Sequence, residues 1–147
     1  MENITIKEAT FLDLCNIQKI ENSLDIRNLS DISIKNDLNS KNSLYLLAFT
    51  NSTCIGYIAC DMLVDHADVS AIAVHEKYRN MGVATLLLKK IVDICVSNKF
   101  NSIFLEVRVS NLIAISLYEK LGFSKIATRK NYYPDNEDAY IYKKDLV

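Results

Sequence analysis

The sequence predicts an α/β protein with a mixed central sheet of about seven strands and about four flanking helices. Short apolar runs rich in β-branched residues alternate with segments whose apolar residues recur at helical spacing. Residues 44–74 contain three strand-like runs in succession, and residues 69–109 follow the order strand, helix, strand, which makes two strands parallel. A chain of 147 residues suits one core. We therefore expect a single domain spanning residues 1–147.

The N-terminal part is expected to form a strand followed by two helices. Residues 3–7 alternate apolar and polar side chains, as in a half-buried strand. Thr10 and Asp13 are spaced as a capping pair that opens a helix ending near Asn22. Residues 30–38 predict a second, shorter helix. The first-helix residues expected to face the core are Leu14, Ile17 and Ile20.

A β-hairpin is expected next. Residues 44–50 and 53–63 are apolar runs separated by Asn51 and Ser52, which suit a two-residue turn. Residues 65–68 are expected to form a second turn. The first half of the chain therefore supplies three antiparallel strands, counting the run that begins at Val69.

The stretch from residue 69 to residue 95 is expected to form a buried strand, a polar turn and a helix. The turn, residues 79–84, places small residues and free backbone N–H groups at a helix start, where the helix dipole attracts anions. A glycine there is also a common turn device, so the turn alone leaves both interpretations open. The apolar residues at helical spacing are Val83, Leu86, Leu87, Ile91, Ile94 and Cys95.

The C-terminal part is expected to return as a strand over residues 101–109, followed by a helix and a closing hairpin. Ser110 or Asn111 suits the cap of that helix, and Gly122 suits its end. The hairpin joins residues 123–129 to residues 138–144. The helix residues expected to face inward are Ile113, Leu117 and Leu121.

Composition excludes several classes of site. The net charge of -1, from 17 basic and 18 acidic residues, argues against nucleic-acid binding through bulk charge. Only three glycines occur, too few and too dispersed for a dinucleotide fingerprint, a P-loop or a G-x-S-x-G elbow. The four cysteines form no C-x-x-C pair and are expected to be buried free thiols.

No metal site and no membrane segment are predicted. His66 and His75 lack companions at metal-ligand spacing. The sequence has no apolar secretory region at its start and no run of 18 apolar residues. We therefore expect a cytoplasmic protein without a bound metal.

Four segments carry a resemblance to a known family. Arg79-x-x-Gly82-x-Ala84 after an apolar strand resembles the acetyl-CoA pyrophosphate loop of the GNAT superfamily of N-acetyltransferases. Residues 105–111, LEVRVSN, and residues 114–123, AISLYEKLGF, resemble the second half of that family. Asn131-Tyr132-Tyr133-Pro134 resembles the RimI-type branch, which acetylates the N-terminal alanine of a ribosomal protein. The resemblance is specific from about residue 69 to residue 142.

The resemblance implies acetyl-CoA as co-substrate and no metal. In this family, the pantetheine arm lies beside a strand whose neighbour has moved away, and the pyrophosphate sits on the turn that follows. It also implies that the N–H of Val74 polarises the acetyl carbonyl. The cofactor-binding residues it implies are Ile72, Ala73, Val74, Arg79, Asn80, Met81, Gly82, Val83, Ala84, Thr85 and Asn111.

Two residues are implied to be catalytic. Alternation along the strand places Phe104, Glu106 and Arg108 on one face, and spacing alone also fits a solvated Glu106–Arg108 pair. Tyr118 alone also fits a core tyrosine. The resemblance implies instead that Glu106 is the general base, acting through a water, and that Tyr118 is the acid facing the departing thiolate.

The acceptor side is less defined. The resemblance implies that Tyr132 and Tyr133 line the acceptor site, where tyrosine hydroxyls suit a peptide backbone. Residues 25–32, DIRNLSDI, lack the Pro-Trp-Ser-like stretch common in RimI-type chains. Three functions stay open: a RimI-type enzyme, an acetyltransferase of a small amine or lysine side chain, and a non-catalytic acyl-CoA-binding module. The expected partner is an N-terminal peptide, such as that of a small-subunit ribosomal protein, with the enzyme a monomer or weak dimer.

Overall fold

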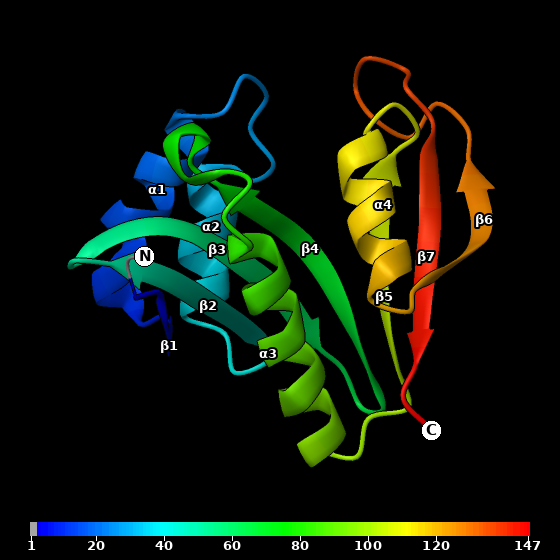
Figure 1. Cartoon of the computed structure of the whole chain (residues 1–147), viewed down its shortest axis with the longest axis horizontal. Helices are drawn as coiled ribbons and strands as arrows, with labels where there is room; N and C mark the ends of the chain where they lie inside the picture. The colour runs from blue at the N-terminus through cyan, green and yellow to red at the C-terminus, as the bar shows by residue number, and fades with distance from the viewer. Residues whose placement is uncertain (1–2) are drawn as a thin grey trace.

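The structure is a computed structural model that describes residues 3–147. The element order is the predicted one, with two short 3₁₀ turns added (Figure 1). The elements are β1 (Thr5–Glu8), η1 (Phe11–Asp13), α1 (Leu14–Asn22), α2 (Asp31–Leu38), β2 (Ser43–Thr50), β3 (Thr53–Met62), β4 (His66–Val74), η2 (Glu76–Tyr78), α3 (Val83–Ser97), β5 (Ser102–Arg108), α4 (Leu112–Lys120), β6 (Ser124–Arg129) and β7 (Ala139–Asp145).

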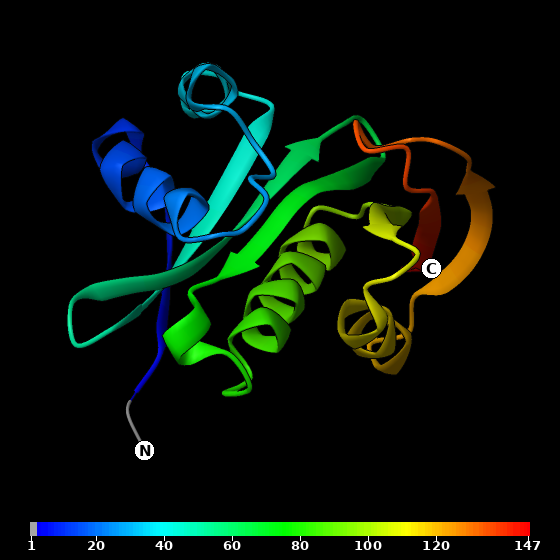
Figure 2. The same ribbon diagram turned by 90° about the horizontal axis from the view of Figure 1, so that it is seen from above.

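The strands form one seven-stranded sheet in the order β1-β2-β3-β4-β5-β7-β6. Only the β4–β5 pair is parallel, as the strand, helix, strand pattern predicted. Helices α1 and α2 cover one face, and α3 and α4 cover the other (Figure 2). One hydrophobic core therefore lies under each pair of helices. No helix within residues 3–147 is long and apolar enough to cross a membrane.

Local signals in the sequence set the ends of several elements. Thr10 and Asp13 form the predicted capping box, with the Thr10 N–H donating to Asp13 Oδ2 at 3.0 Å. Ser30 caps α2 by accepting from the Ser33 N–H at 3.1 Å. Asn51 and Ser52 both adopt positive φ, 48° and 67°, as a type I′ hairpin turn requires.

Helix α4 ends as the sequence predicted. Gly122 has a φ of 89°, and its N–H donates to the Glu119 carbonyl at 3.1 Å. The Phe123 N–H donates to the Tyr118 carbonyl at 3.0 Å, which completes a Schellman motif. At the other end, Asn111 caps the helix by accepting from the Ala114 N–H at 3.2 Å. Tyr118 is therefore held on a helix that is fixed at both ends.

The prediction that Ile113 faces inward was wrong, and Leu86 lies off the buried face of α3. Leu86 is 41% exposed and Ile113 is 83% exposed. In α3 the buried stripe runs through Leu87 and Leu88, and at 100° per residue Leu86 lies about two fifths of a turn from its centre. In α4 the stripe is centred near Leu117 and Tyr118, about a quarter of a turn from Ile113.

Two further expectations need correction. The turn predicted at residues 65–68 is shorter, because β4 already begins at His66, whose carbonyl accepts from the Leu63 N–H at 2.9 Å. All four cysteines are free thiols, but only Cys60 and Cys95 are buried. Cys15 is exposed on α1, and Cys54 is partly exposed near the start of β3.

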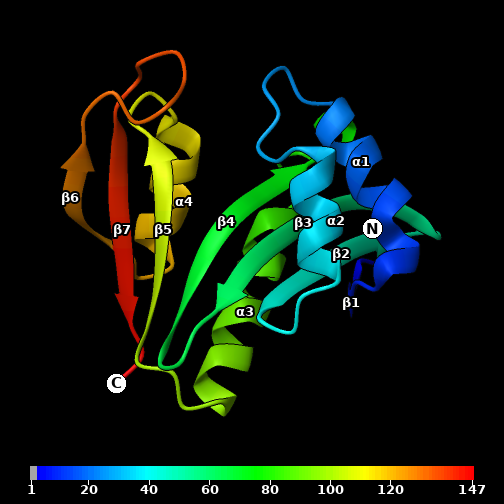
Figure 3. The same ribbon diagram turned by 180° about the vertical axis from the view of Figure 1, so that it is seen from behind.

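Strands β4 and β5 separate part-way along their length. They pair from His66 with Ser102 to Val69 with Leu105, whereas β4 continues to Val74 and β5 to Arg108. The separation follows a β-bulge, in which Ser70 is the extra residue opposite the Ala59–Cys60 step of β3. Figure 3 shows the two strands parting toward their C-terminal ends. The resemblance implied this opening, and composition and spacing did not predict it.

Candidate active site

The C-terminal end of β4 has main-chain groups that point toward the opening and pair with no strand of the described chain. The His75 N–H donates to the Ile55 carbonyl on the β3 side at 2.8 Å. Main-chain groups alternate in direction along a strand, so those of Ala73 also point to β3, and those of Ile72 and Val74 point to the opposite side. Since β5 has separated there, no strand pairs with them in the described chain.

The turn after β4 leads directly into the N-terminus of α3. Asn80 and Gly82 both adopt positive φ, 63° and 80°. Gly82 is the N-cap residue, and no side chain caps the helix, so the N–H groups of the first turn face outward. A Cβ at Gly82 would meet nothing within 4 Å, so its conformation, rather than crowding by the protein, requires glycine.

Most of the predicted cofactor residues are therefore adjacent in space. Val83 is buried under the turn, Ala84 and Thr85 are half-buried, and Met81 is 44% exposed. The Arg79 side chain folds back, with Nε donating to the Val74 carbonyl at 3.2 Å. Asn111 lies across the opening, at the start of α4.

Glu106 lies on the β5 face that is turned away from α4. The neighbouring residues Leu105 and Val107 are buried in the core under α3 and α4, whereas the Glu106 side chain is 34% exposed. Arg129 Nη1 of β6 is 3.8 Å from Glu106 Oε2. A hydrogen bond to Glu106 raises the pKa of Tyr132.

The alternative pairing of Glu106 with Arg108 is not formed. Arg108 Nη1 binds Asp135 Oδ2 at 2.8 Å and Glu137 Oε1 at 2.9 Å. Its guanidinium lies 4.1 Å from the centroid of the Tyr133 ring. Both acidic partners belong to the loop between β6 and β7. Their bonds to Arg108 hold that loop over the end of β5.

The loop of residues 130–138 is held over the end of β5. Besides Arg108, the Ser110 N–H donates to Glu137 Oε2 at 3.0 Å, and the Ser110 hydroxyl donates to the same oxygen. These bonds from Ser110 and Arg108 lower the pKa of Glu137. The rings of Tyr132 and Tyr133 contact edge to face, with centroids 5.0 Å apart. Both predicted acceptor residues are therefore next to Glu106.

Tyr118 lies on the other face of the sheet, in the core under α3 and α4. Its ring is 5% exposed and packs near Phe123 and Tyr142. Burial raises the pKa of Tyr118. Its hydroxyl has no hydrogen bond within residues 3–147. Every buried side-chain oxygen in that range has a partner, so the Tyr118 oxygen keeps some contact with solvent.

The loop between α1 and α2, residues 23–30, lies on the face that carries Glu106. Its Leu24 and Leu29 pack against the core that contains Ala71 and Ala73 of β4. In Figures 1 and 3 this loop and the β6–β7 loop both stand at the end where β4 and β5 part.

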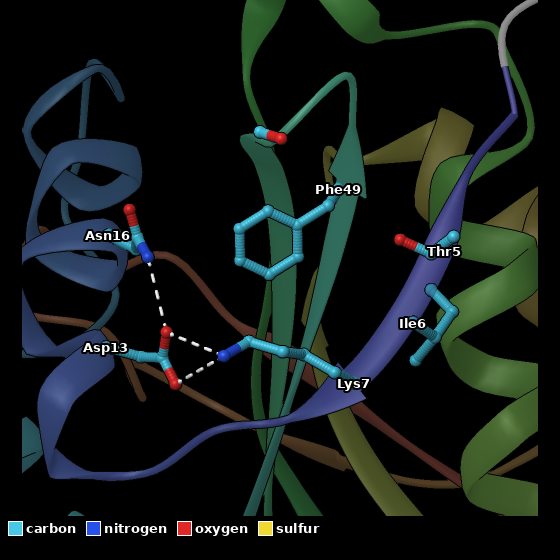
Figure 4. Close-up of a pocket in the computed structure, with 7 residues that line it drawn as sticks. Thr5, Ile6, Lys7, Asp13, Asn16 and Phe49 are labelled. Atoms are coloured by element: carbon cyan, nitrogen blue, oxygen red, sulfur yellow. Dashed lines mark hydrogen bonds and ion pairs between the residues drawn. The ribbon is translucent and has the colours of Figure 1, made fainter.

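A surface depression of ≈ 490 Å³ lies elsewhere, beside β1, and contains none of the predicted site residues. Figure 4 shows Lys7 at its centre, with Nζ bound to Asp13 at 3.1 Å. The cation of Lys7 is thereby neutralised, so this depression offers no evident chemistry. Within residues 3–147, no group of three or more His, Cys, Asp or Glu side chains is arranged to hold a metal ion.

Sequence reasoning missed two residues, Arg129 beside Glu106 and Glu21 beneath the α1–α2 loop. Arg129 gave no local signal, because its contact with Glu106 arises only when β6 and β5 are brought together across β7. Glu21 is completely buried, although it is charged. Its signal was available, since Glu21 follows Ile17 by four residues on the predicted inner face of α1.

Comparison with known proteins identifies the family. Residues 11–123 match the family model described as Acetyltransferase (GNAT) family. This chain belongs to the GNAT family of acetyltransferases. An N-alpha-acetyltransferase from Saccharolobus solfataricus is 34% identical over 98% of this chain and 94% of its own length. The bS18-alanine N-acetyltransferase of Haemophilus ducreyi is 36% identical over 66% of this chain and 68% of its own.

Solved structures agree with this assignment. The crystal structure of the ribosomal-protein-S18-alanine N-acetyltransferase from Escherichia coli has a TM-score of 0.92 and 29% identity, covering 98% of this chain and 94% of that one. A chain of the NatC complex bound to Gag peptide and CoA has a TM-score of 0.87 and 26% identity, with 100% of both chains covered. This GNAT protein is therefore an N-acetyltransferase with RimI-like relatives.

Proposed function

We propose that this GNAT protein transfers the acetyl group of acetyl-CoA to the α-amine of a protein N-terminus. The preferred acceptor is an N-terminal alanine, as found on a small-subunit ribosomal protein. One observation carries the proposal: β4 and β5 separate after Val69 and Leu105, with Glu106 on one face of β5 and Tyr118 in the core on the other face. An amine and a thioester that enter from opposite faces can meet only in that opening.

The cofactor is proposed to lie along β4 and the turn that follows. The main-chain groups of Ile72 and Val74 suit the amides of pantetheine, and the first-turn N–H groups of α3 suit the pyrophosphate. The side-chain oxygen of Asn111 already caps α4, which leaves its amide N–H groups as donors. Support comes from the NatC structure, which is bound to CoA.

The proposed reaction is a direct attack. The amine nitrogen bonds to the thioester carbon, the C–S bond breaks, and the amine proton passes through a water to Glu106. The Val74 N–H polarises the acetyl carbonyl. Transfer of the phenol proton to the thiolate is uphill by about 2 kcal/mol at ordinary pKa values, and burial of Tyr118 increases this cost. Tyr118 therefore acts by donating a hydrogen bond to the thiolate.

An α-amine suits this site better than a lysine side chain. An α-amine with a pKa of about 8 is neutral roughly 250 times more often at pH 7 than a lysine amine near 10.4. Tyr132 and Tyr133 stand beside Glu106 with hydroxyl groups that suit a peptide backbone. The relatives named as N-alpha-acetyltransferases and as a bS18-alanine N-acetyltransferase support the same acceptor class.

An acceptor screen tests the proposal. We would compare kcat/KM for hexapeptides that begin with Ala, Ser or Met-Leu, an acetylated Ala peptide with an internal Lys, spermidine and an aminoglycoside. The Ala peptide is expected to have the highest kcat/KM. A polyamine or antibiotic that exceeds it tenfold, a margin of about 1.4 kcal/mol, would instead assign the enzyme to small amines. Acetyl-CoA binding without any acetylated acceptor would indicate a binding module.

A further inference from the structure

Glu21, on the last turn of α1, is a carboxylate that is completely buried under the α1–α2 loop. Its Oε1 accepts from the N–H groups of Asn28 and Leu29, both at 2.7 Å. Its Oε2 accepts from the Tyr57 hydroxyl at 2.9 Å and from Asn28 Nδ2 at 3.4 Å. No buried side-chain oxygen in the described chain lacks a partner, so this carboxylate is fully used.

These bonds connect the loop to the sheet. Tyr57 belongs to β3 and pairs with Ala73 of β4, next to the main-chain groups proposed to hold the cofactor. Leu29, one of the two residues that donate to Glu21 through the backbone, packs against the core containing Ala71 and Ala73. One buried carboxylate therefore ties the backbone of the loop to β3, beside the end of β4.

Between the core contacts of Leu24 and Leu29, the loop residues 25–28 are exposed. Ile26 is 59% exposed, and Arg27 makes only exposed contacts, to Asn22 at 2.9 Å and to Asp31 at 2.8 Å. Exposed ion pairs of this kind contribute little to stability. Bonds to a buried carboxylate are stronger, because its charge shortens and strengthens them.

We propose that Glu21 is a positioning residue, which holds the α1–α2 loop in place as one wall of the acceptor site. The predicted effect on acceptor binding rests on the proposed function. The contact between Glu21 and the loop does not depend on that function. Loss of the carboxylate frees Asn28 and Leu29, so the loop moves and acceptor binding weakens. The cofactor lies on the α3 and α4 side and is unaffected.

Three variants separate positioning from general stability. Glu21→Ala removes the bonds to the loop. Glu21→Gln keeps an oxygen that accepts both backbone N–H groups, and its amide can donate to Tyr57. Tyr45→Phe is the control. Like Tyr57, Tyr45 is a buried tyrosine bonded to a carboxylate, but its partner is Asp37 of α2, at 2.6 Å, and not a residue that holds the loop.

KM values for the Ala hexapeptide and for acetyl-CoA are the deciding measurements. Glu21→Ala is expected to raise the peptide KM about tenfold or more while the acetyl-CoA KM changes less than twofold. Glu21→Gln and Tyr45→Phe should keep both KM values within about twofold of the wild type. A smaller folded fraction lowers the apparent kcat without changing KM. Equal changes in both KM values, or an unchanged peptide KM in Glu21→Ala, would overturn the proposal.

Hydrogen exchange of the wild type tests the contact without any variant. The amides of Asn28 and Leu29 should exchange much more slowly than the amide of Arg27, although all three residues lie in a surface loop. Equal exchange rates would overturn the proposal even if Glu21→Ala failed to fold. If the wild type acetylates no peptide, the proposed function fails, and the role of Glu21 in acceptor binding is rejected with it. Slow exchange of the Asn28 and Leu29 amides would still establish their contact with Glu21.

Discussion

The guanidinium of Arg129 lies 3.8 Å from the carboxylate of Glu106, although β7 separates the strands that carry them. The same carboxylate raises the pKa of Tyr132, which follows Arg129 in the loop after β6. Two groups from one segment therefore lie beside the proposed base. The guanidinium also lies 5.5 Å from the centroid of the Tyr132 ring, so the three side chains form one cluster.

Glu106→Gln should lower kcat by about 10² to 10⁴, because the amide cannot take a proton. Arg129→Gln is the matched control: it removes the half-exposed partner and should lower kcat less than about tenfold. Initial rates with the Ala peptide at pH 7 measure both effects. An undiminished rate in Glu106→Gln would show that the carboxylate is only a structural partner of Arg129.

Tyr118→Phe should lower kcat by about 10- to 100-fold, because a hydrogen bond to a charged group contributes about 1.5–3 kcal/mol. The unfolding free energy should change little, since the hydroxyl has no hydrogen bond within residues 3–147. The acetyl-CoA KM, measured in parallel, should stay within twofold. A wild-type rate in the variant would leave Tyr118 as a core tyrosine.

Gly82→Ala should weaken stabilisation by acetyl-CoA. Alanine at a φ of 80° is strained by about 1–2 kcal/mol, and its methyl group would occupy the open space proposed for the pyrophosphate. Gly122→Ala is the control, since Gly122 has a similar φ of 89° at the far end of α4. Thermal unfolding with and without acetyl-CoA should show a reduced ligand-dependent shift only for Gly82→Ala. Equal shifts in both variants would contradict the pyrophosphate assignment.

Stability should fall steeply above about pH 10. Burial raises the pKa values of Tyr45, Tyr57, Tyr118 and Tyr133, that of Tyr133 to about 12. Unfolded tyrosines titrate near 10, so above that pH the unfolded chain binds fewer protons than the folded chain, and unfolding becomes more favourable as pH rises. The stability from these raised pKa values is fully present below about pH 10.

Urea unfolding from pH 8 to pH 12, together with phenolate absorbance, measures this effect. The buried tyrosines should ionise only as the protein unfolds. Normal ionisation of every tyrosine near pH 10 in a protein that remains folded would contradict the expectation.

Leu87→Ala should destabilise the protein by about 2–5 kcal/mol, because Leu87 is completely buried on the core-facing side of α3. Leu86→Ala, the adjacent control, should cost about 0.5 kcal/mol or less, because Leu86 is 41% exposed. Urea denaturation of both variants measures the difference. Similar losses would mean that the rotation of α3 is wrong.

Much of the fold was predictable because its signals are local. The Thr10 and Asp13 capping box, the Asn51–Ser52 turn and the Gly122 helix end each depend on residues within a few positions of one another. No local signal sets how α3 and α4 are rotated about their own axes. Leu86 and Ile113 are apolar, and their exposure depends on where the sheet lies. Periodicity alone therefore did not identify either residue as exposed.

The candidate site divides in the same way. The turn at Arg79 to Ala84 is a contiguous segment, so its character as a helix start with free N–H groups was evident from the chain itself. The roles of Glu106 and Tyr118 came from the family resemblance, because their spacing fits structural roles equally well. Arg129 beside Glu106 and Glu21 beneath the α1–α2 loop have partners far away in sequence.

The sequence by itself determined the order of the elements, their caps and the family, since each of these is encoded in short segments. Only the tertiary structure decided that β4 and β5 separate after Val69 and Leu105. The separation accompanies the bulge at Ser70, which exists only in the pairing of β4 with β3. Pairing is a relationship between strands, so the opening between Glu106 and Tyr118 could not be read from either strand alone.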